Sequence, residues 1–210
     1  MMTYNSQWKQ DQWLNENIFK NKQNGFFVDV GAHDGVDINN TLFYEQQLGW
    51  KGICIEPIPK IFDKLEENRK AICVHGCAYN TDGIVPFNCI EGYCEMLSGV
   101  VSNYANEHVN RIDREMKQHG GKKKILYSSS YRLETIFDTH DVTHVDYLSI
   151  DTEGTEMNVL RGINFDKVTI DVIEAEVNYP QDEKTIGEFL TQHGYQFRVK
   201  LGGDVVYIKN

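Results

Sequence analysis

The chain has 210 residues, of which 40% are hydrophobic and 25% charged, and its formal net charge is -10. These values are ordinary for a globular protein, and the length allows one domain with a full core. The acidic balance argues against a protein that binds the phosphate backbone of nucleic acids, and no apolar run approaches the ~20 residues that a membrane-spanning helix needs.

The N-terminal part of the chain is expected to form a helix over residues 6–20. This helix would have an apolar face at roughly helical spacing, made of Trp8, Trp13, Leu14 and Ile18. We expect it to cover one edge of a sheet or a pocket, as a lid or substrate element.

Residues 26–35 are the most informative stretch of the chain, and they read F-F-V-D-V-G-A-H-D-G. The apolar run at the start is typical of a buried parallel strand. Gly31 and Gly35 allow a tight turn in which backbone comes close to a ligand. A helical stretch follows and extends to Leu48. A strand, a glycine turn and a helix in this order open a nucleotide-binding α/β unit.

The amino-acid sequence of this turn favours one class of cofactor. It lacks both the G-x-G-x-x-G of a dinucleotide site and the Gly-Lys-Ser/Thr of a P-loop. Its acids, Asp29 and Asp34, would repel a pyrophosphate, whereas a carboxylate suits a cationic ligand. S-adenosylmethionine carries an ammonium and a sulfonium group and no phosphate. A purely structural turn without a ligand is the alternative.

A second strand, over residues 52–56, ends in Glu56. In nucleotide-binding folds, an acid about 20 residues beyond the glycines accepts hydrogen bonds from ribose hydroxyls. Glu56 stands at that distance, so the sequence predicts a ribose contact there.

The middle of the chain departs from a regular alternation of strands and helices. After a helix from Pro59 to about residue 70, we expect strands over 71–78 and 84–88. Residues 91–124 contain four glycines and a polar helical stretch that ends in three lysines. We interpret this interval as an insertion that forms a lid or substrate loop.

The second half of the chain returns to alternating elements. Helices are expected over 133–139, 156–161 and 184–193, strands over 145–150 and 171–177, and a closing hairpin over 195–199 and 205–209. This pattern predicts a mostly parallel sheet with an antiparallel pair at its end.

Acids and amides gather at the predicted strand ends. Ligands of an open α/β sheet bind beyond the carboxyl ends of its strands. The residues concerned are Asp29, Asp34, Glu56, Asp151, Glu153, Glu176 and Asn178. Helix N-termini favour acids, and this preference explains the position of Glu156 and is an alternative explanation for Glu153. It explains Glu176 less well.

Two chemical roles remain open for the later acids. Asp151, Glu176 and Asn178 would make an oxygen-ligand set for Mg²⁺ or Mn²⁺, and such an ion could lower the pKa of a substrate hydroxyl. Without a metal, Asp151, Glu153 or Glu176 would act as general base. A serine hydrolase fits poorly, because the chain has no G-x-S-x-G elbow.

The cysteines and the N-terminus indicate a cytoplasmic protein. The five cysteines form no C-x-x-C pair, and the first residues lack the apolar core of a signal peptide. Reduced thiols are therefore expected.

Taken together, these motifs resemble the FkbM family of S-adenosylmethionine-dependent methyltransferases, over nearly the whole chain. The pieces that carry the resemblance are F-F-V-D-V-G-A-H-D-G, N-N-T-L-F-Y-E, G-W-K-G-I-C-I-E-P, M-L-S-G and L-S-I-D-T-E-G-T-E. The resemblance implies one Rossmann-like class I methyltransferase domain over 1–210, with a seven-stranded sheet and helices on both faces. It also implies methyl transfer to a hydroxyl of a sugar, a glycan or a natural product.

The resemblance further implies roles for individual residues. Cofactor contacts would be Asp29, Gly31, His33, Gly35, Asn40, Thr41, Glu56 and Ser98, and Ser98 could instead approach the acceptor. Asp151, Glu153 and Glu176 would face the reacting hydroxyl. Many relatives carry histidine where this chain has Asn178, so the base or the third metal ligand stays open.

Other functions are weighed against this one. A nicotinamide-dependent oxidoreductase is disfavoured by the missing third glycine, and a non-catalytic module by the later acids. RNA or DNA methylation is opposed by the acidic balance. The expected partner is a small-molecule or glycan acceptor, and a second subunit of a homodimer could supply another wall of the pocket.

Overall fold

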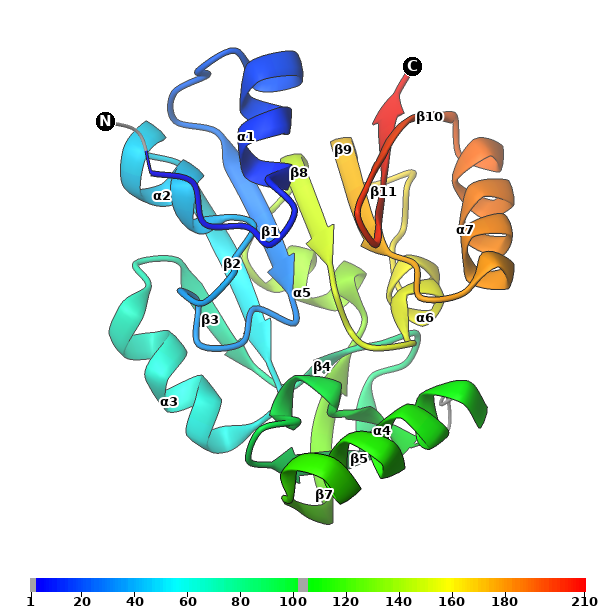
Figure 1. The fold of residues 1–210 in the computed structure, drawn as a ribbon. Helices are drawn as coiled ribbons and strands as arrows, with labels where there is room; N and C mark the ends of the chain where they lie inside the picture. The colour runs from blue at the N-terminus through cyan, green and yellow to red at the C-terminus, as the bar shows by residue number, and fades with distance from the viewer. Residues whose placement is uncertain (1–2, 102–105) are drawn as a thin grey trace.

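A computed structural model describes residues 3–101 and 106–210. The chain forms a seven-stranded sheet with helices on both faces, and a smaller four-stranded sheet lies beyond the carboxyl ends of its parallel strands (Figure 1). In the described part of the chain, no helix has the length and apolar character to cross a bilayer.

The large sheet has the strand order β10-β11-β9-β8-β1-β2-β3. Its strands are β1 (Phe26–Val30), β2 (Lys51–Glu56), β3 (Ile72–His75), β8 (His144–Ile150), β9 (Thr169–Glu176), β10 (Tyr195–Leu201) and β11 (Asp204–Lys209). Strands β3, β2, β1, β8 and β9 are parallel, whereas β11 runs antiparallel to both β9 and β10. The predicted class I methyltransferase fold, with its antiparallel hairpin at the end, is confirmed.

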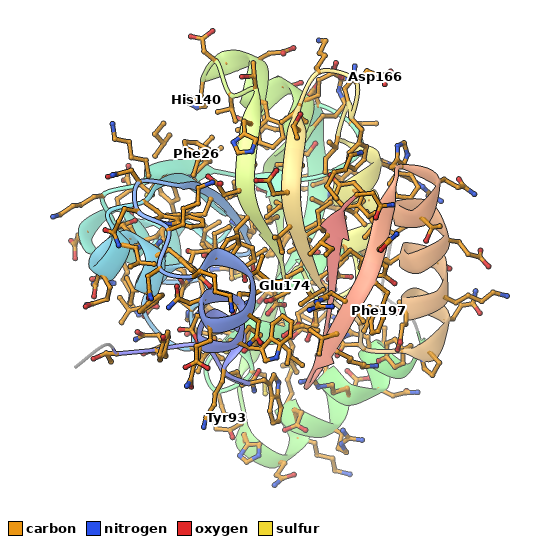
Figure 2. All side chains as sticks on the ribbon, turned by 90° about the horizontal axis from the view of Figure 1, so that it is seen from above. Phe26, Tyr93, His140, Asp166, Glu174 and Phe197 are labelled. Atoms are coloured by element: carbon orange, nitrogen blue, oxygen red, sulfur yellow. The ribbon has the colours of Figure 1, made fainter. Side chains whose placement is uncertain are left out.

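Two apolar cores lie on the two faces of this sheet. One contains side chains of α1 (Gln10–Leu14), the π-helix η1 (Asn15–Phe19), α2 (Leu42–Leu48) and α3 (Pro59–Asn68). The other contains side chains of α5 (Leu133–Thr139), α6 (Glu156–Arg161) and α7 (Pro180–Gln192). Glu174 is buried in the middle of the sheet, and Phe197 lies exposed on its edge strand (Figure 2).

The smaller sheet is the main difference from the sequence-based expectation. Its order is β4-β7-β5-β6, and its strands are β4 (Cys77–Ala78), β5 (Gly83–Glu91), β6 (Gly99–Val100) and β7 (Lys122–Tyr131). The 3-10 turn η2 (Glu95–Leu97) and the helix α4 (Asn106–His119) lie between β5 and β7 in the chain. The interval 91–124 is therefore not a plain insertion, because its ends belong to paired strands.

Two further boundaries differ from prediction. The expected strand over 71–78 is divided at Gly76, and its two parts join different sheets. The expected helix over 6–20 begins only at Gln10, so that Trp8 precedes it and is exposed.

A buried arginine holds the helix side of the glycine turn in place. Arg69 donates from Nη1 to the Gly35 carbonyl (3.1 Å) and from Nη2 to the Thr41 hydroxyl (2.9 Å). Its Nε donates to a Glu45 carboxylate oxygen at 3.0 Å, and Nη1 lies 3.9 Å from an Asp29 oxygen. Two acids, Asp29 and Glu45, thus share one buried cation.

Replacing Arg69 with methionine is expected to lower the free energy of unfolding by about 3–5 kcal/mol, because buried acids would lose their cation. Urea denaturation of the variant measures this loss. The exposed Arg198, replaced in the same way, serves as the control and should change stability by less than about 0.5 kcal/mol. A loss below about 1 kcal/mol in the Arg69 variant would show that the turn does not need this ion pair.

Candidate active site

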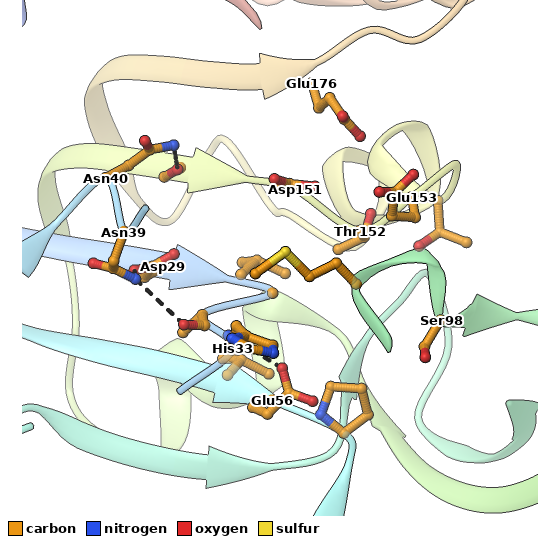
Figure 3. A pocket seen from close by; sticks show the side chains of 18 of the residues that line it. Asp29, His33, Asn39, Asn40, Glu56, Ser98, Asp151, Thr152, Glu153 and Glu176 are labelled. Atoms are coloured by element: carbon orange, nitrogen blue, oxygen red, sulfur yellow. Dashed lines mark hydrogen bonds between the residues drawn. The ribbon is translucent and has the colours of Figure 1, made fainter. Parts of the chain in front are cut away.

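A pocket lies at the carboxyl ends of β1, β2, β8 and β9, between the two sheets (Figure 3). The N-terminal segment, the residues around η2 and Arg111 of α4 complete its walls. Two groups of polar side chains face each other across it: Asp29, His33 and Glu56 on one side, and Asp151, Glu153 and Glu176 on the other.

The glycine turn packs directly against the end of β8. Gly31 has φ +83°, and a Cβ built on it would lie 1.8 Å from the Asp151 carbonyl oxygen. Its N–H donates to the Ile55 carbonyl at 3.0 Å, so the turn is tied to β2 as well. Only glycine fits here, and the backbone itself forms part of the pocket wall.

Asp29 lies at the base of this wall. One of its carboxylate oxygens accepts hydrogen bonds from Asn39 Nδ2 (2.9 Å) and from the Thr41 hydroxyl (2.7 Å). Burial raises the pKa of Asp29, and the nearby Arg69 works against that rise.

Two of the predicted cofactor contacts lie behind the wall and do not line the pocket. Thr41 is fully buried and directs its hydroxyl at Asp29. Gly35 has φ +77° and packs against the stem of Arg69. Both residues belong to the glycine turn or its flank, as predicted. We infer that they support the turn and do not contact the cofactor directly.

Glu56 and His33 lie together at the end of β2. The two Glu56 oxygens accept hydrogen bonds from the backbone N–H groups of Ile58 (2.7 Å) and His33 (3.2 Å). Burial raises the pKa of Glu56 to about 7. Both ring nitrogens of His33 are buried and make no hydrogen bond, but each lies beside an acid: Nδ1 is 3.7 Å from an Asp34 oxygen and Nε2 is 3.4 Å from a Glu95 oxygen.

Apolar side chains line the pocket beside Glu56. They come from the β2–α3 junction, from the short strand β4 and from the smaller sheet: Ile58, Cys77, Ala78, Phe87, Leu97 and Val100. The sequence did not reveal this slot, because most of its wall belongs to the smaller sheet, whose pairing was not predicted.

Two further predicted cofactor contacts, Asn40 and Ser98, line the pocket. Their polar side-chain atoms form hydrogen bonds within the protein. The Asn40 amide donates to Ser149 Oγ (3.1 Å) and to a Glu174 oxygen (2.9 Å). The Ser98 hydroxyl donates to the Glu95 carbonyl at 2.6 Å and accepts from the Ile90 N–H at 3.0 Å.

The opposite side of the pocket is a crowded set of carboxyl groups. One oxygen from each of Asp151, Glu153 and Glu176 lies within 4.8 Å of the others. Desolvation within the pocket and repulsion from the neighbouring acids raise the pKa of Asp151 and Glu176 well above their usual range, although Asp151 is still exposed to the cavity. Burial also raises the pKa of Glu153, to about 7, although Arg111 opposes the rise. Three carboxylates this close repel one another. They therefore share protons unless a bound cation balances their charge.

Asn178 does not join this set. It is exposed beyond the end of β9, does not line the pocket, and donates to a Glu176 oxygen at 2.7 Å. The chain leaves the sheet after Glu176, and the third carboxyl group beside Asp151 and Glu176 is that of Glu153. The ligand set of Asp151, Glu176 and Asn178 stays a prediction.

The pocket also contains residues that sequence reasoning did not assign to the site, among them Trp8, Gln10, Arg111 and Asp204. The Gln10 amide donates to Asp204, which lies at the start of β11. Arg111 Nη1 lies 3.6 Å from a Glu153 oxygen that is buried without a hydrogen bond. None of them stands in a strand-end motif, so no local signal marked them.

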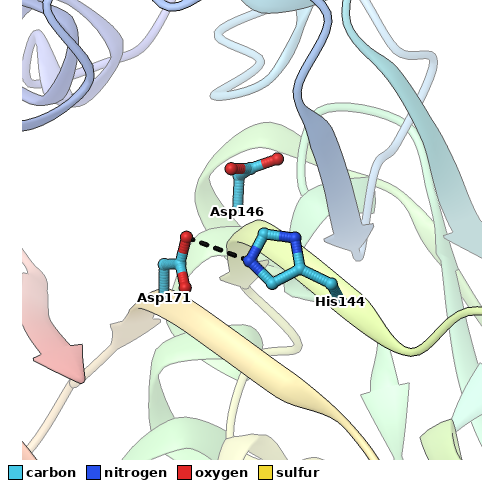
Figure 4. Close-up of side chains that lie close together, drawn as sticks. All are labelled: His144, Asp146 and Asp171. Atoms are coloured by element: carbon cyan, nitrogen blue, oxygen red, sulfur yellow. Dashed lines mark hydrogen bonds and ion pairs between the residues drawn. The ribbon is translucent and has the colours of Figure 1, made fainter.

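A second cluster, at the opposite end of the sheet, is neutralised internally (Figure 4). His144 Nε2 lies 3.1 Å from an Asp171 oxygen. The neighbouring Asp146 accepts from Lys22 Nζ and from the Phe26 N–H (2.7 Å). Since Asp146 already has a cation and an amide, we assign this cluster a structural role.

Comparisons with known proteins show the family and the fold of the chain. A profile for the methyltransferase FkbM domain matches residues 29–197. Among curated proteins, no similar sequence was found. Among solved structures, the chain is similar to methyltransferase FkbM from Methylobacillus flagellatus KT, with 14% identity and a TM-score of 0.55 over 90% of this chain and 44% of that one.

Another similar structure is Aeropyrum pernix fibrillarin in complex with natively bound S-adenosyl-L-methionine. The identity is 13% and the TM-score 0.50, over 97% of this chain and 73% of that one. At such identities these structures speak for the fold alone, whereas the domain profile spans most of the chain. The chain thus has the Rossmann-like fold of class I methyltransferases and belongs to the FkbM methyltransferase family.

Proposed function

We propose that this methyltransferase uses S-adenosylmethionine to methylate a hydroxyl group of a sugar or glycan. The observation that carries the proposal is the arrangement of the pocket. One side with Asp29, the glycine turn and Glu56, and another with three carboxyl groups, face each other within one cavity.

The residues on the first side fit the cofactor. Glu56 offers a carboxylate to ribose hydroxyls, and the adjoining apolar slot suits a flat adenine ring. Asp29 and the glycine turn would lie along the cationic methionine part. The His33 ring, held between Asp34 and Glu95, would border the cofactor on this side.

The residues on the second side fit activation of an alcohol. When bound, S-adenosylmethionine supplies an electrophilic methyl group on a sulfonium. Asp151, Glu153 and Glu176 would orient the acceptor hydroxyl, and one of them would take its proton as the new carbon–oxygen bond forms. The carbon–sulfur bond breaks, S-adenosylhomocysteine leaves, and the proton passes to solvent.

A divalent cation is the other way to satisfy these carboxyl groups. Three carboxylates whose oxygens lie within 4.8 Å are a donor set that suits Mg²⁺ or Mn²⁺. Such an ion would be held by Asp151, Glu153 and Glu176, and it would lower the pKa of a nearby hydroxyl.

Two measurements test the proposal. Calorimetry should show binding of S-adenosylhomocysteine and none of NAD. Radiolabelled methyl transfer should then be followed to methyl glycosides and to non-sugar alcohols, with and without a chelator. Binding of NAD instead, or no transfer to any hydroxyl, would contradict the proposal. Transfer only to non-sugar alcohols would favour a natural-product acceptor.

Affinity for S-adenosylhomocysteine is expected to fall as the pH is lowered below about 7. The pKa of Glu56 is raised to about 7 in the free protein, and ribose hydroxyls donate to the ionised carboxylate. Binding must therefore remove a proton below that pH, which costs up to about tenfold in affinity per pH unit. Calorimetry between pH 5.5 and 8.5 (a range set by about 1.5 units on either side of the pKa) measures the trend.

The Glu56→Gln variant provides the control. It should bind more weakly at high pH and should lose most of the pH dependence. The stability of the free protein should show the opposite trend. Because the pKa of Glu56 is higher in the folded protein than in the unfolded chain, Glu56 contributes stability at a pH below its unfolded-state pKa of 4.5. That contribution is lost as the pH rises through about 7. A variant that keeps the wild-type pH profile would place the titrating group elsewhere.

A further inference from the structure

Trp8 is an exposed aromatic residue on the wall of the pocket. Its relative exposure is 53%, and it lines the same cavity as Asp151 and Glu176. Aromatic side chains in the wall of a pocket offer apolar surface to a ligand, and the few polar groups around them fix its orientation.

The indole rests on the backbone of the β10–β11 turn. Gly202 has φ +61°, and a Cβ built on it would lie 2.2 Å from the indole Cγ. Only a glycine lets the ring pack this closely. The turn therefore supports one side of the ring system.

Trp8 is also tied to the carboxylate side of the pocket. Its backbone N–H donates to Gln10 Oε1 at 2.7 Å, and the Gln10 side-chain amide donates to Asp204. Asp204 pairs with Glu176 in the register of β11 and β9. Asp151 follows Ile150, which pairs with Ala175, the neighbour of Glu176. The strand ends thus carry a row of acids, Asp151, Glu176 and Asp204, with the indole beyond Asp204.

We propose that this arrangement is an acceptor subsite for a neutral pyranose ring. The apolar C–H face of the sugar stacks on the Trp8 indole, and its hydroxyls donate to the row of carboxylates. Aromatic side chains supply contact area at a low cost in conformational entropy, and they leave the ring edge to polar groups. This inference rests on the proposed function and specifies its substrate class.

The charges of the pocket argue for a neutral sugar over a uronic acid. Among the described lining residues, Arg111 is the single arginine or lysine, and it lies beside Glu153. A sugar carboxylate near Trp8 would meet Asp204 and Glu176 without a cation of its own. Like charges at close range disfavour binding.

The test compares variants of the full chain loaded with S-adenosylhomocysteine. Saturation-transfer NMR and titration first rank the methyl pyranosides of glucose, galactose, mannose and rhamnose, together with methyl glucuronide. Methyl transfer from S-adenosylmethionine to the best neutral glycoside is then measured in Trp8→Ala, Trp8→Phe and Gly202→Ala. Trp13→Phe is the matched control, because Trp13 packs on the apolar core and does not line the pocket.

We expect Trp8→Ala and Gly202→Ala to raise the KM for the glycoside at least tenfold, with little change in S-adenosylhomocysteine affinity. Trp8→Phe and Trp13→Phe should stay within about threefold of wild type, since phenylalanine keeps an aromatic face. The neutral glycoside should bind at least tenfold more tightly than the glucuronide.

Three outcomes would overturn the subsite: an unchanged KM in Trp8→Ala, equal binding of the glucuronide, or methylation of a non-sugar alcohol without binding of any pyranoside. In each of them S-adenosylhomocysteine still binds and the methyltransferase proposal stands. If S-adenosylhomocysteine does not bind to the wild type, the proposed function fails, and the subsite fails with it.

Discussion

Replacing Asp151 with asparagine is expected to lower kcat by about 10²- to 10⁴-fold while S-adenosylhomocysteine still binds within about threefold of wild type. The Asp151 side chain belongs to the carboxylate side of the pocket, and its oxygen lies within 4.8 Å of oxygens of Glu153 and Glu176. Asparagine keeps the shape but cannot accept a proton, and it is a poorer metal ligand. Methyl-transfer kinetics and calorimetry on the same preparation separate the two effects.

This substitution should not destabilise the fold. Burial and neighbouring acids raise the pKa of Asp151, so a neutral amide relieves repulsion. Asp171→Asn, at the opposite end of the sheet, is the matched control and should leave kcat unchanged. If the Asp151 variant lost cofactor binding together with turnover, Asp151 would have to be reassigned to the cofactor side.

Replacing Gly31 with alanine is expected to lower the free energy of unfolding by about 2–5 kcal/mol and to abolish measurable binding of S-adenosylhomocysteine. The new methyl group would lie 1.8 Å from the Asp151 carbonyl oxygen, at a φ of +83°. Neither strand can easily yield, because Asp151 N–H donates to the Val30 carbonyl at 2.9 Å and Gly31 N–H donates to Ile55. Urea denaturation and calorimetry measure the two losses.

Gly203→Ala is the control for this effect. Gly203 also lines the pocket, but a Cβ there meets nothing within 4 Å and its φ is not in the left-handed region. That variant should change stability by less than about 1 kcal/mol. A Gly31 variant as stable as the Gly203 variant would mean that the turn and β8 can move apart.

Prediction from sequence succeeded where the signals were local. The strand Phe26–Val30 and the helix Leu133–Thr139 have the predicted bounds, because apolar runs and periodic faces encode them directly. Glycines and prolines supplied the helix ends at Gly49 and Pro59. The alternation of these elements was enough to predict a parallel sheet.

Prediction failed for the smaller sheet because its pairing is non-local. Strand β7 begins with three lysines and contains three consecutive serines, so it lacks an apolar strand pattern. It is stabilised by pairing with β5, from Gly83 opposite Ser130 to Glu91 opposite Lys122. A short sequence window of the kind that reveals one strand cannot contain both, because β5 ends at Glu91 and β7 begins at Lys122.

For the site, the sequence by itself determined which strand ends carry acids, because parallel strands bring their carboxyl ends to one edge. Only the tertiary structure decided which side chains face the pocket. Thr41 is turned inward to Asp29, Asn178 leaves the sheet, and Trp8 is brought in from a distant segment by the glycine turn of β10 and β11. The direction of a side chain depends on what packs against it, and those neighbours are set by the fold as a whole.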